Sequence, residues 1–239
     1  MTKRIDDLIQ SICGASGHPL APLLRQWCGE SPQFIAFAEA HATKIHKKAR
    51  LASGDDELAD LLAELAVAAV LARDRRFAVV YEPYRASGQR GPDFHVLFKT
   101  HAPFHVEVTR LRLREPAGDD QAGAALKLAR AVCDKIGQFP PGAMSLLAVV
   151  VPPRAQSDEL APAAIRLIES YAQRAASLAS PELRPEGVRE YLRHRQRLSA
   201  IALCSFTDAW RPLLVKLWQN PGAKHPLIPD VVRYLLQAS

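Results

Sequence analysis

GPDFHVLFKTHAPFHVEVTRLRL, residues 91–113, is the stretch from which the architecture of this chain can be worked out. It contains two short runs of β-type residues, at about 92–99 and 103–113, joined by a tight connection. Asp93 lies at the start of the first run and Glu107 in the middle of the second. We expect these carboxylates to meet at one edge of a sheet, where two rigidly held carboxylates can bind a hard divalent cation.

Composition restricts the class of protein before any motif is considered. The chain has 239 residues and a formal net charge of +6, which fits one domain with helical additions and is compatible with a polyanionic partner. The four cysteines include no Cys-x-x-Cys pair, so we expect buried, reduced thiols and no zinc site. The N-terminus has no apolar segment of a signal peptide, and no apolar run approaches the roughly 20 residues that cross a bilayer. We therefore expect a cytoplasmic protein without a membrane partner.

Helical patterns dominate the residues before this stretch. Apolar spacing predicts helices at 3–13 and 18–28, and Ser31-Pro32 begins a longer helix that runs to about residue 51. That helix ends in the basic patch 46–50, which we interpret as a solvated helix end, with a phosphate contact as the alternative. A helix at 57–73 follows, apolar all round except for Asp60 and Glu64. Glu64 either lies on a wet face beside Asp60 or is buried, and a buried carboxylate must be paired, hydrogen-bonded or coordinating.

The remaining elements predict an α/β fold with a mixed sheet flanked by helices. A strand at 77–81, continuing to 84, forms a three-strand meander with the two β-type runs. A helix at 121–136, capped by Asp119-Asp120, precedes an apolar run at 145–151 that suits a strand buried on both faces. Further helices are expected at 158–179, 186–195 and 229–237, and further strands at 198–206 and 213–218. We divide the chain into a helical extension at 1–53, a core at 54–155, and an α/β extension at 156–239 packed on the core.

The element order and three acids resemble the PD-(D/E)XK nuclease superfamily, whose restriction-endonuclease-like fold has an αβββαβ core. Glu64 matches the acid of the first helix, Pro92-Asp93 matches "PD", and Glu107-Val108-Thr109 stands where "(D/E)XK" belongs. The resemblance covers about residues 57–151. It implies a metal-dependent nuclease that acts on nucleic acid, DNA more than RNA, with Glu64, Asp93 and Glu107 as ligands of Mg²⁺ or Mn²⁺. By analogy with the superfamily, it also implies a possible homodimer.

Thr109 departs from the family pattern, which has a lysine that orients or activates the attacking water. Thr109 shares a strand face with Glu107 but cannot supply a cation or act as a general base near neutral pH. In one interpretation Lys127 or Lys99 has taken over the lysine function and Thr109 supports the site, whereas Arg110 lies on the opposite strand face. In a second, the fold is an inactive module that binds nucleic acid or protein. In a third, the chain is an unrelated binding protein whose acids are structural.

Other polar residues near these motifs have two interpretations each. Glu82 could be a fourth acid near the metal, or it could pair with Arg85 or Arg90. His95 and His105 could ligate a transition metal, but we favour solvent-facing strand positions. Exposed basic residues offer phosphate contacts that would make binding salt-dependent: Lys47, Lys48, Arg90 and Arg112. The loop from Asn220 to His225 receives no assigned role.

Overall fold

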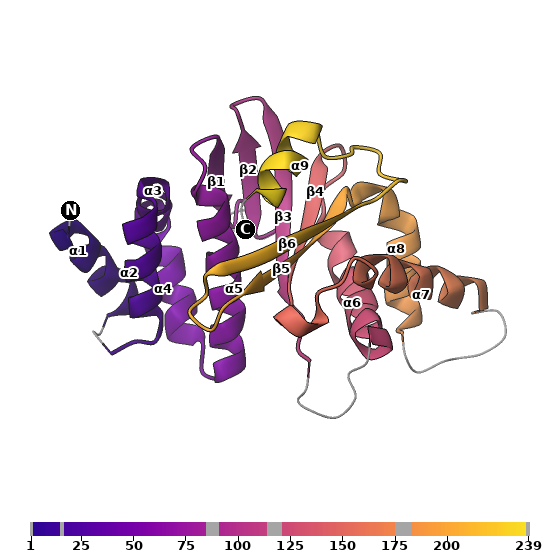
Figure 1. Cartoon of the computed structure of the whole chain (residues 1–239), viewed down its shortest axis with the longest axis horizontal. Coiled ribbons are helices and arrows are strands. Elements are labelled where there is room, and N and C mark those ends of the chain that lie inside the picture. The colour runs from indigo at the N-terminus through magenta and orange to yellow at the C-terminus, as the bar shows by residue number, and fades with distance from the viewer. Residues whose placement is uncertain (1, 15–16, 85–90, 114–120, 175–182, 238–239) are drawn as a thin grey trace.

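Six strands form one mixed sheet with helices on both faces (Figure 1). The computed structural model describes residues 2–14, 17–84, 91–113, 121–174 and 183–237. The strands follow one another across the sheet in chain order: β1 (Phe77–Tyr81), β2 (Phe94–Phe98), β3 (Ala102–Arg110), β4 (Met144–Val150), β5 (Ala200–Phe206) and β6 (Pro212–Gln219). The pairs β1–β2, β2–β3 and β5–β6 are antiparallel, and β3, β4 and β5 run parallel. The predicted α/β class, the meander and the mixed sheet are confirmed.

Alternation along the strands supplies two hydrophobic cores, one on each face of the sheet. On one face, Phe104, Val106 and Val108 of β3 belong to the same core as the apolar residues of α5 (Asp55–Ala72). On the other, Leu147 and Val149 of β4 belong to the same core as those of α6 (Gln121–Lys135). The first core also includes residues of α1 to α4 and of α9 (Pro229–Leu236), and the second includes residues of α7 (Leu160–Arg174) and α8 (Pro185–His194). The short 3₁₀ helices are η2 (Ile136–Gln138), η3 (Pro153–Ala155) and η4 (Arg195–Arg197).

The N-terminal helices are α1 (Thr2–Cys13), α2 (Leu20–Glu30), α3 (Pro32–Ala40) and α4 (Ala42–Leu51). The prediction of one helix from Ser31 to about residue 51 is wrong, because the chain breaks at His41. The Tyr81 backbone N–H donates to His41 Nε2 at 3.2 Å, so the break coincides with a tertiary contact that local sequence does not encode. Ser31 caps α3 as expected, and its hydroxyl also donates to the Ala72 carbonyl at the end of α5 at 2.6 Å.

Backbone conformation sets the ends of the meander. β1 ends at Tyr81, not at residue 84, because Glu82 has a φ of 45°. At the opposite end of the sheet, the β2–β3 turn places Lys99 and Thr100 at φ values of 48° and 64°. Residues other than glycine rarely adopt this left-handed backbone conformation, but it suits the twist of a tight hairpin. The turn fixes a register in which Phe98 is paired with Ala102 and Phe94 with Val106.

Other expectations have mixed outcomes. All four cysteines lie in the described part of the chain and are free thiols; Cys13 is half-buried and the other three are buried. No helix among the described residues is long and apolar enough to span a membrane. The helix cap at Asp119-Asp120, the basic residues Arg85 and Arg90, and the end of the helix expected at 158–179 lie outside the described residues.

Candidate metal centre

The candidate site lies at the end of the sheet where the pairing of β1 with β2 and of β2 with β3 ends, while β3 continues beside β4. The last β2–β3 pair joins Phe94 to Val106, while β3 stays paired with β4 as far as Arg110. Glu107 is the first β3 residue beyond the last β2 pair, and Asp93 immediately precedes β2. The two acids are therefore brought together at one edge, as the sequence predicts, by a difference in strand length.

Asp93 and Glu107 hold each other through backbone groups. The Asp93 N–H donates to Glu107 Oε2 at 3.2 Å, and the Val108 N–H donates to Asp93 Oδ2 at 2.8 Å. Gly91 lies two residues earlier, against the ring of Tyr84, and a Cβ at this position would overlap that ring. Glycine is thus required for the backbone that leads into Pro92-Asp93.

Glu64 reaches the same place from the middle of α5. Its Oε2 accepts a hydrogen bond from the buried Tyr81 hydroxyl and lies 2.7 Å from Lys48 Nζ. Lys48 also lies 3.1 Å from Glu82 Oε1, and its ammonium group is 4.9 Å from the centroid of the Tyr81 ring. Glu64 is therefore not on a wet face beside Asp60, and Glu82 joins the three predicted acids through Lys48.

Lys135, the last residue of α6, contacts Glu107 on the face of the sheet opposite α5. Its Nζ lies 2.5 Å from Glu107 Oε1, and the Glu107 side chain is only 1% exposed. Each oxygen of Glu107 thus has a partner, the Lys135 ammonium on one and the Asp93 N–H on the other. This arrangement fixes the orientation of the carboxylate.

The acids influence one another electrostatically. Burial, followed by the charges of Glu64 and Glu107, holds the pKa of Asp93 well above its usual value. Burial also raises the pKa of Glu107, although Lys135 opposes this effect. Burial disfavours the charged form of both lysines, but the Glu64 carboxylate raises the pKa of Lys48 and Glu107 raises that of Lys135. Both ammonium groups therefore remain protonated at neutral pH.

We name Glu64, Glu82, Asp93 and Glu107 the acid cluster. If all four carboxylates are ionised, they exceed the two lysines by two negative charges. Carboxylate oxygens are the ligands that Mg²⁺ and Mn²⁺ prefer, so the donor chemistry fits a hard divalent cation. The described residues contain no group of three His, Cys, Asp or Glu side chains already arranged to hold a metal ion. The carboxylates instead contact Lys48, Lys135, Tyr81 and backbone N–H groups.

The structure does not bring every predicted residue to this cluster. Lys99 is at the opposite end of β2, with its Nζ 2.6 Å from Asp230 Oδ2 of α9. Lys127 lies two turns before Lys135 on α6 and lines a groove beyond the end of β3. Thr109 is half-buried, opposite Val149 in the β3–β4 register. Arg110 lies on the face opposite Glu107, as expected, and forms ion pairs with Asp56 and Asp60 of α5.

The histidine predictions need one correction. His105 is buried, not solvent-facing, and its ring centroid lies 5.0 Å from that of His95. Burial, together with His95, lowers the pKa of His105 to about 4, so this ring is neutral at physiological pH. His225 belongs to a connecting loop, where its carbonyl accepts a hydrogen bond from the Ser199 hydroxyl at 2.6 Å.

Sequence reasoning missed Lys135 and assigned Lys48 to a solvated patch, although both had a detectable pattern. Lys135 lies three residues after Val132 and seven after Leu128, on the buried face of α6. Lys48 follows Lys44 by four residues and stands beside the buried Ala49. A lysine on an apolar helix face indicates a buried acidic partner.

Comparisons with protein-family models, curated proteins and solved structures give no match to this chain. The geometry of the acid cluster is therefore the basis on which a function is proposed.

Proposed function

We propose that the chain is a divalent-metal-dependent nuclease that hydrolyses phosphodiester bonds of nucleic acid, DNA more than RNA. The observation that carries this proposal is the electrostatic proximity of Glu64, Asp93 and Glu107, which come from a helix and two strands. If these three and Glu82 are ionised, they carry more negative charge than Lys48 and Lys135 neutralise. The arrangement is similar to that of the PD-(D/E)XK superfamily, and the order α5, β1, β2, β3, α6, β4 supports a restriction-endonuclease-like core.

Glu64, Asp93 and Glu107 would hold Mg²⁺ or Mn²⁺. When bound, the ion would supply a hydroxide nucleophile and stabilise the charge that develops on the phosphoryl oxygens. Lys135 supplies the cation that Thr109 lacks, from a half-buried position, and it orients the buried Glu107 through a contact of 2.5 Å. Lys135 thus replaces Lys127 and Lys99 as our candidate for the lysine function. Tyr81 and Lys48 hold Glu64.

A second candidate function rests on the same two lysines. Lys48 and Lys135 already act as counterions of the acids, and a site stabilised in this way does not require a metal. The chain would then be an inactive module of the same fold that binds nucleic acid or protein. The two functions differ in one measurable property, the affinity of the cluster for a divalent cation.

Calorimetric titration of Mn²⁺ and Mg²⁺ distinguishes these functions. The nuclease requires micromolar to millimolar binding by the wild type, lost when Asp93→Asn and Glu107→Gln are combined. The isosteric amides preserve the size of both side chains. A matched control is Glu39→Gln, which removes a carboxylate paired with Arg4 on the N-terminal helices.

Cleavage assays complete the test. Supercoiled plasmid and single-stranded oligonucleotides should be cut in Mn²⁺ or Mg²⁺ by the wild type and the Glu39→Gln control, and not by the double variant. If the wild type binds no divalent cation with or without DNA, the nuclease proposal fails and the inactive module replaces it.

A further inference from the structure

A groove of about 1160 Å³ opens beyond the carboxyl ends of β3, β4 and β5. The carboxyl ends of parallel strands are a common location for ligand-binding crevices in open α/β sheets. Residues from α5, the end of β3, α6 and the β5–β6 turn line this groove, including Asp56, Arg110, Arg112, Lys127, Arg130 and Trp210. We name it the strand-end groove.

Basic side chains line two sides of the strand-end groove. Arg110 and Arg112 follow Glu107 along β3 and its extension, while Lys127 and Arg130 come from α6. Asp56 and Asp60 of α5 position the two arginines: Arg110 Nη2 lies 2.5 Å from Asp56 Oδ1. Arg112 Nη2 donates to Asp60 Oδ2, and Arg112 Nη1 lies 3.4 Å from Asp56 Oδ2. The Arg112 side chain is 54% exposed. Ion pairs that water reaches are weak, so its planar guanidinium group remains able to bind a phosphate.

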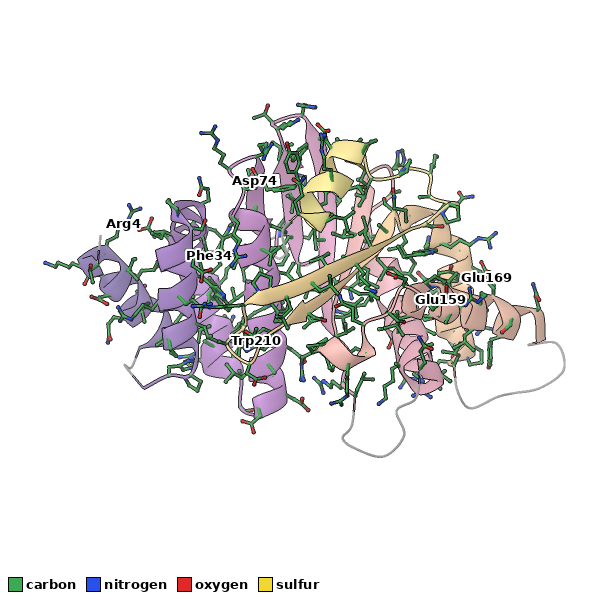
Figure 2. The ribbon with its side chains drawn as sticks, in the orientation of Figure 1. Arg4, Phe34, Asp74, Glu159, Glu169 and Trp210 are labelled. Atoms are coloured by element: carbon green, nitrogen blue, oxygen red, sulfur yellow. The ribbon has the colours of Figure 1, made fainter. Side chains whose placement is uncertain are left out.

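Trp210 borders the groove from the turn between β5 and β6. Its φ of 55° is left-handed, a conformation that a bulky residue rarely adopts and that Gly or Asn adopts readily. The turn is held by the Trp210 N–H, which donates to the Thr207 carbonyl at 2.8 Å, and by the Thr207 N–H, which donates to the Arg211 carbonyl at 2.9 Å. Figure 2 shows Trp210 beside the end of the β5–β6 ribbon that lies near the lower turns of α5.

We infer that the strand-end groove binds a single-stranded segment of nucleic acid. Phosphates lie against Arg112, Lys127 and Arg130, and one base stacks on the outer side of Trp210, a half-buried residue that packs against the first core with its ring centroid 5.8 Å from that of Phe206. Aromatic rings bind unpaired bases because every base has a free π-face once it leaves the duplex. In a duplex those faces are covered by neighbouring base pairs, so the groove selects single strands.

This inference rests on the proposed nuclease function and adds a substrate class to it. Asp56, Asp60 and Glu64 occupy successive turns of α5, so the helix connects the groove to the acid cluster. Eight residues of helix span about 12 Å, a distance that a few nucleotides of an unpaired strand cover. The groove thus holds the strand a few nucleotides from the bond that the cluster would cut.

The test is fluorescence anisotropy with a labelled oligothymidylate of about 15 nucleotides, the upper range of one single-strand binding groove. EDTA is present, so neither a metal nor cleavage enters the measurement. With about 0.7 units of salt slope per phosphate contact, three contacts give a slope of log K against log salt of about −2. Arg112→Gln should reduce that slope by about 0.7, whereas Arg189→Gln, an exposed arginine on α8 that pairs with Glu186, should leave it unchanged.

A second variant removes the aromatic ring without disturbing the turn. Asn tolerates the left-handed backbone, so Trp210→Asn should keep the fold, as thermal melting will show, and weaken oligothymidylate binding at least 5-fold. Trp218→Phe on β6 is the matched control. The inference is overturned if binding is unchanged in both Trp210→Asn and Arg112→Gln, or if a duplex of equal length binds more tightly than the single strand. Binding without cleavage in Mn²⁺ would refute the nuclease alone, and cleavage with normal binding in both groove variants would refute the groove alone.

Discussion

Replacing Asp93 by asparagine should make the metal-free protein more stable. The Asp93 carboxyl group is buried beside Glu64 and Glu107, and burial and these two charges hold its pKa well above the usual value. In the metal-free state the group must therefore either carry a charge at a cost or take up a proton. Asparagine keeps the oxygen that accepts the Val108 N–H at 2.8 Å and removes the charge.

The size of the effect follows from relief of burial and carboxylate repulsion, offset by the loss of the Lys48 attraction and by a weaker hydrogen bond from Val108. Like charges about 6 Å apart repel by about 3 kcal/mol at an effective dielectric constant near 20. The hydrogen bond from Val108 loses about 1 kcal/mol when its acceptor becomes neutral. A net gain of about 2 kcal/mol corresponds to a rise in Tm of roughly 4–8 °C for a chain of this size.

Differential scanning calorimetry in EDTA measures this gain, with Asp230→Asn as the control. Asp230 is paired with Lys99 and Arg233 at the surface, and its pKa is lowered, mainly by the Lys99 hydrogen bond. Its replacement should therefore leave the Tm unchanged or lower it. A lower Tm for Asp93→Asn than for the wild type would show that the acid cluster is already fully compensated, and the excess of negative charge on which the metal proposal rests would not exist.

Three further predictions concern the groups around the cluster. Lys135→Met should destabilise the protein by about 3–5 kcal/mol in urea denaturation, because it leaves the Glu107 charge buried without its cation; adding Glu107→Gln should restore most of the loss, and no restoration would contradict this pairing. Lys48→Met should tighten Mn²⁺ binding about 10-fold in calorimetry, since Glu64 and Glu82 lose the ammonium that competes with the metal; unchanged affinity would place the metal elsewhere. Burial, aided by Lys44, lowers the pKa of His41, so its stabilising contribution is complete above about pH 6.5 and is lost as the pH falls. His41→Gln should therefore flatten the stability profile below about pH 6.5, and an unaltered slope there would refute this assignment.

Local patterns predicted the strands and most helices because alternation and apolar spacing report burial directly. The order of α5, the meander, α6 and β4 follows from such patterns, as does the meeting of Asp93 with Glu107. The break at His41 escaped prediction because the contact that accompanies it, with the Tyr81 N–H, comes from 40 residues away in the chain. Local sequence carries little information about such a contact.

The lysines of the site were harder to predict than its acids. A carboxylate that opens a strand or interrupts an apolar helix is conspicuous, whereas Lys48 and Lys135 stand among other lysines near helix ends. Which of several lysines meets Glu107 depends on the rotation of α6 against the sheet, and that rotation is set by the packing of the second core. Lys127, two turns earlier on the same helix, lines the strand-end groove instead.

The turn at Lys99 and Thr100 has a consequence for how this protein tolerates insertions. Exposed hairpin tips ordinarily accept extra residues, but this turn sets the β2–β3 register and thereby the position of Asp93 opposite Glu107. One added residue would shift every later pair by one step and turn every side chain of the shifted strand to the other face. The acids would then separate, although the insertion lies five residues of β2, about 17 Å, away. The number of residues in the β2–β3 turn therefore determines whether Asp93 lies opposite Glu107. We expect insertions in this turn to disrupt the site, although the turn is exposed.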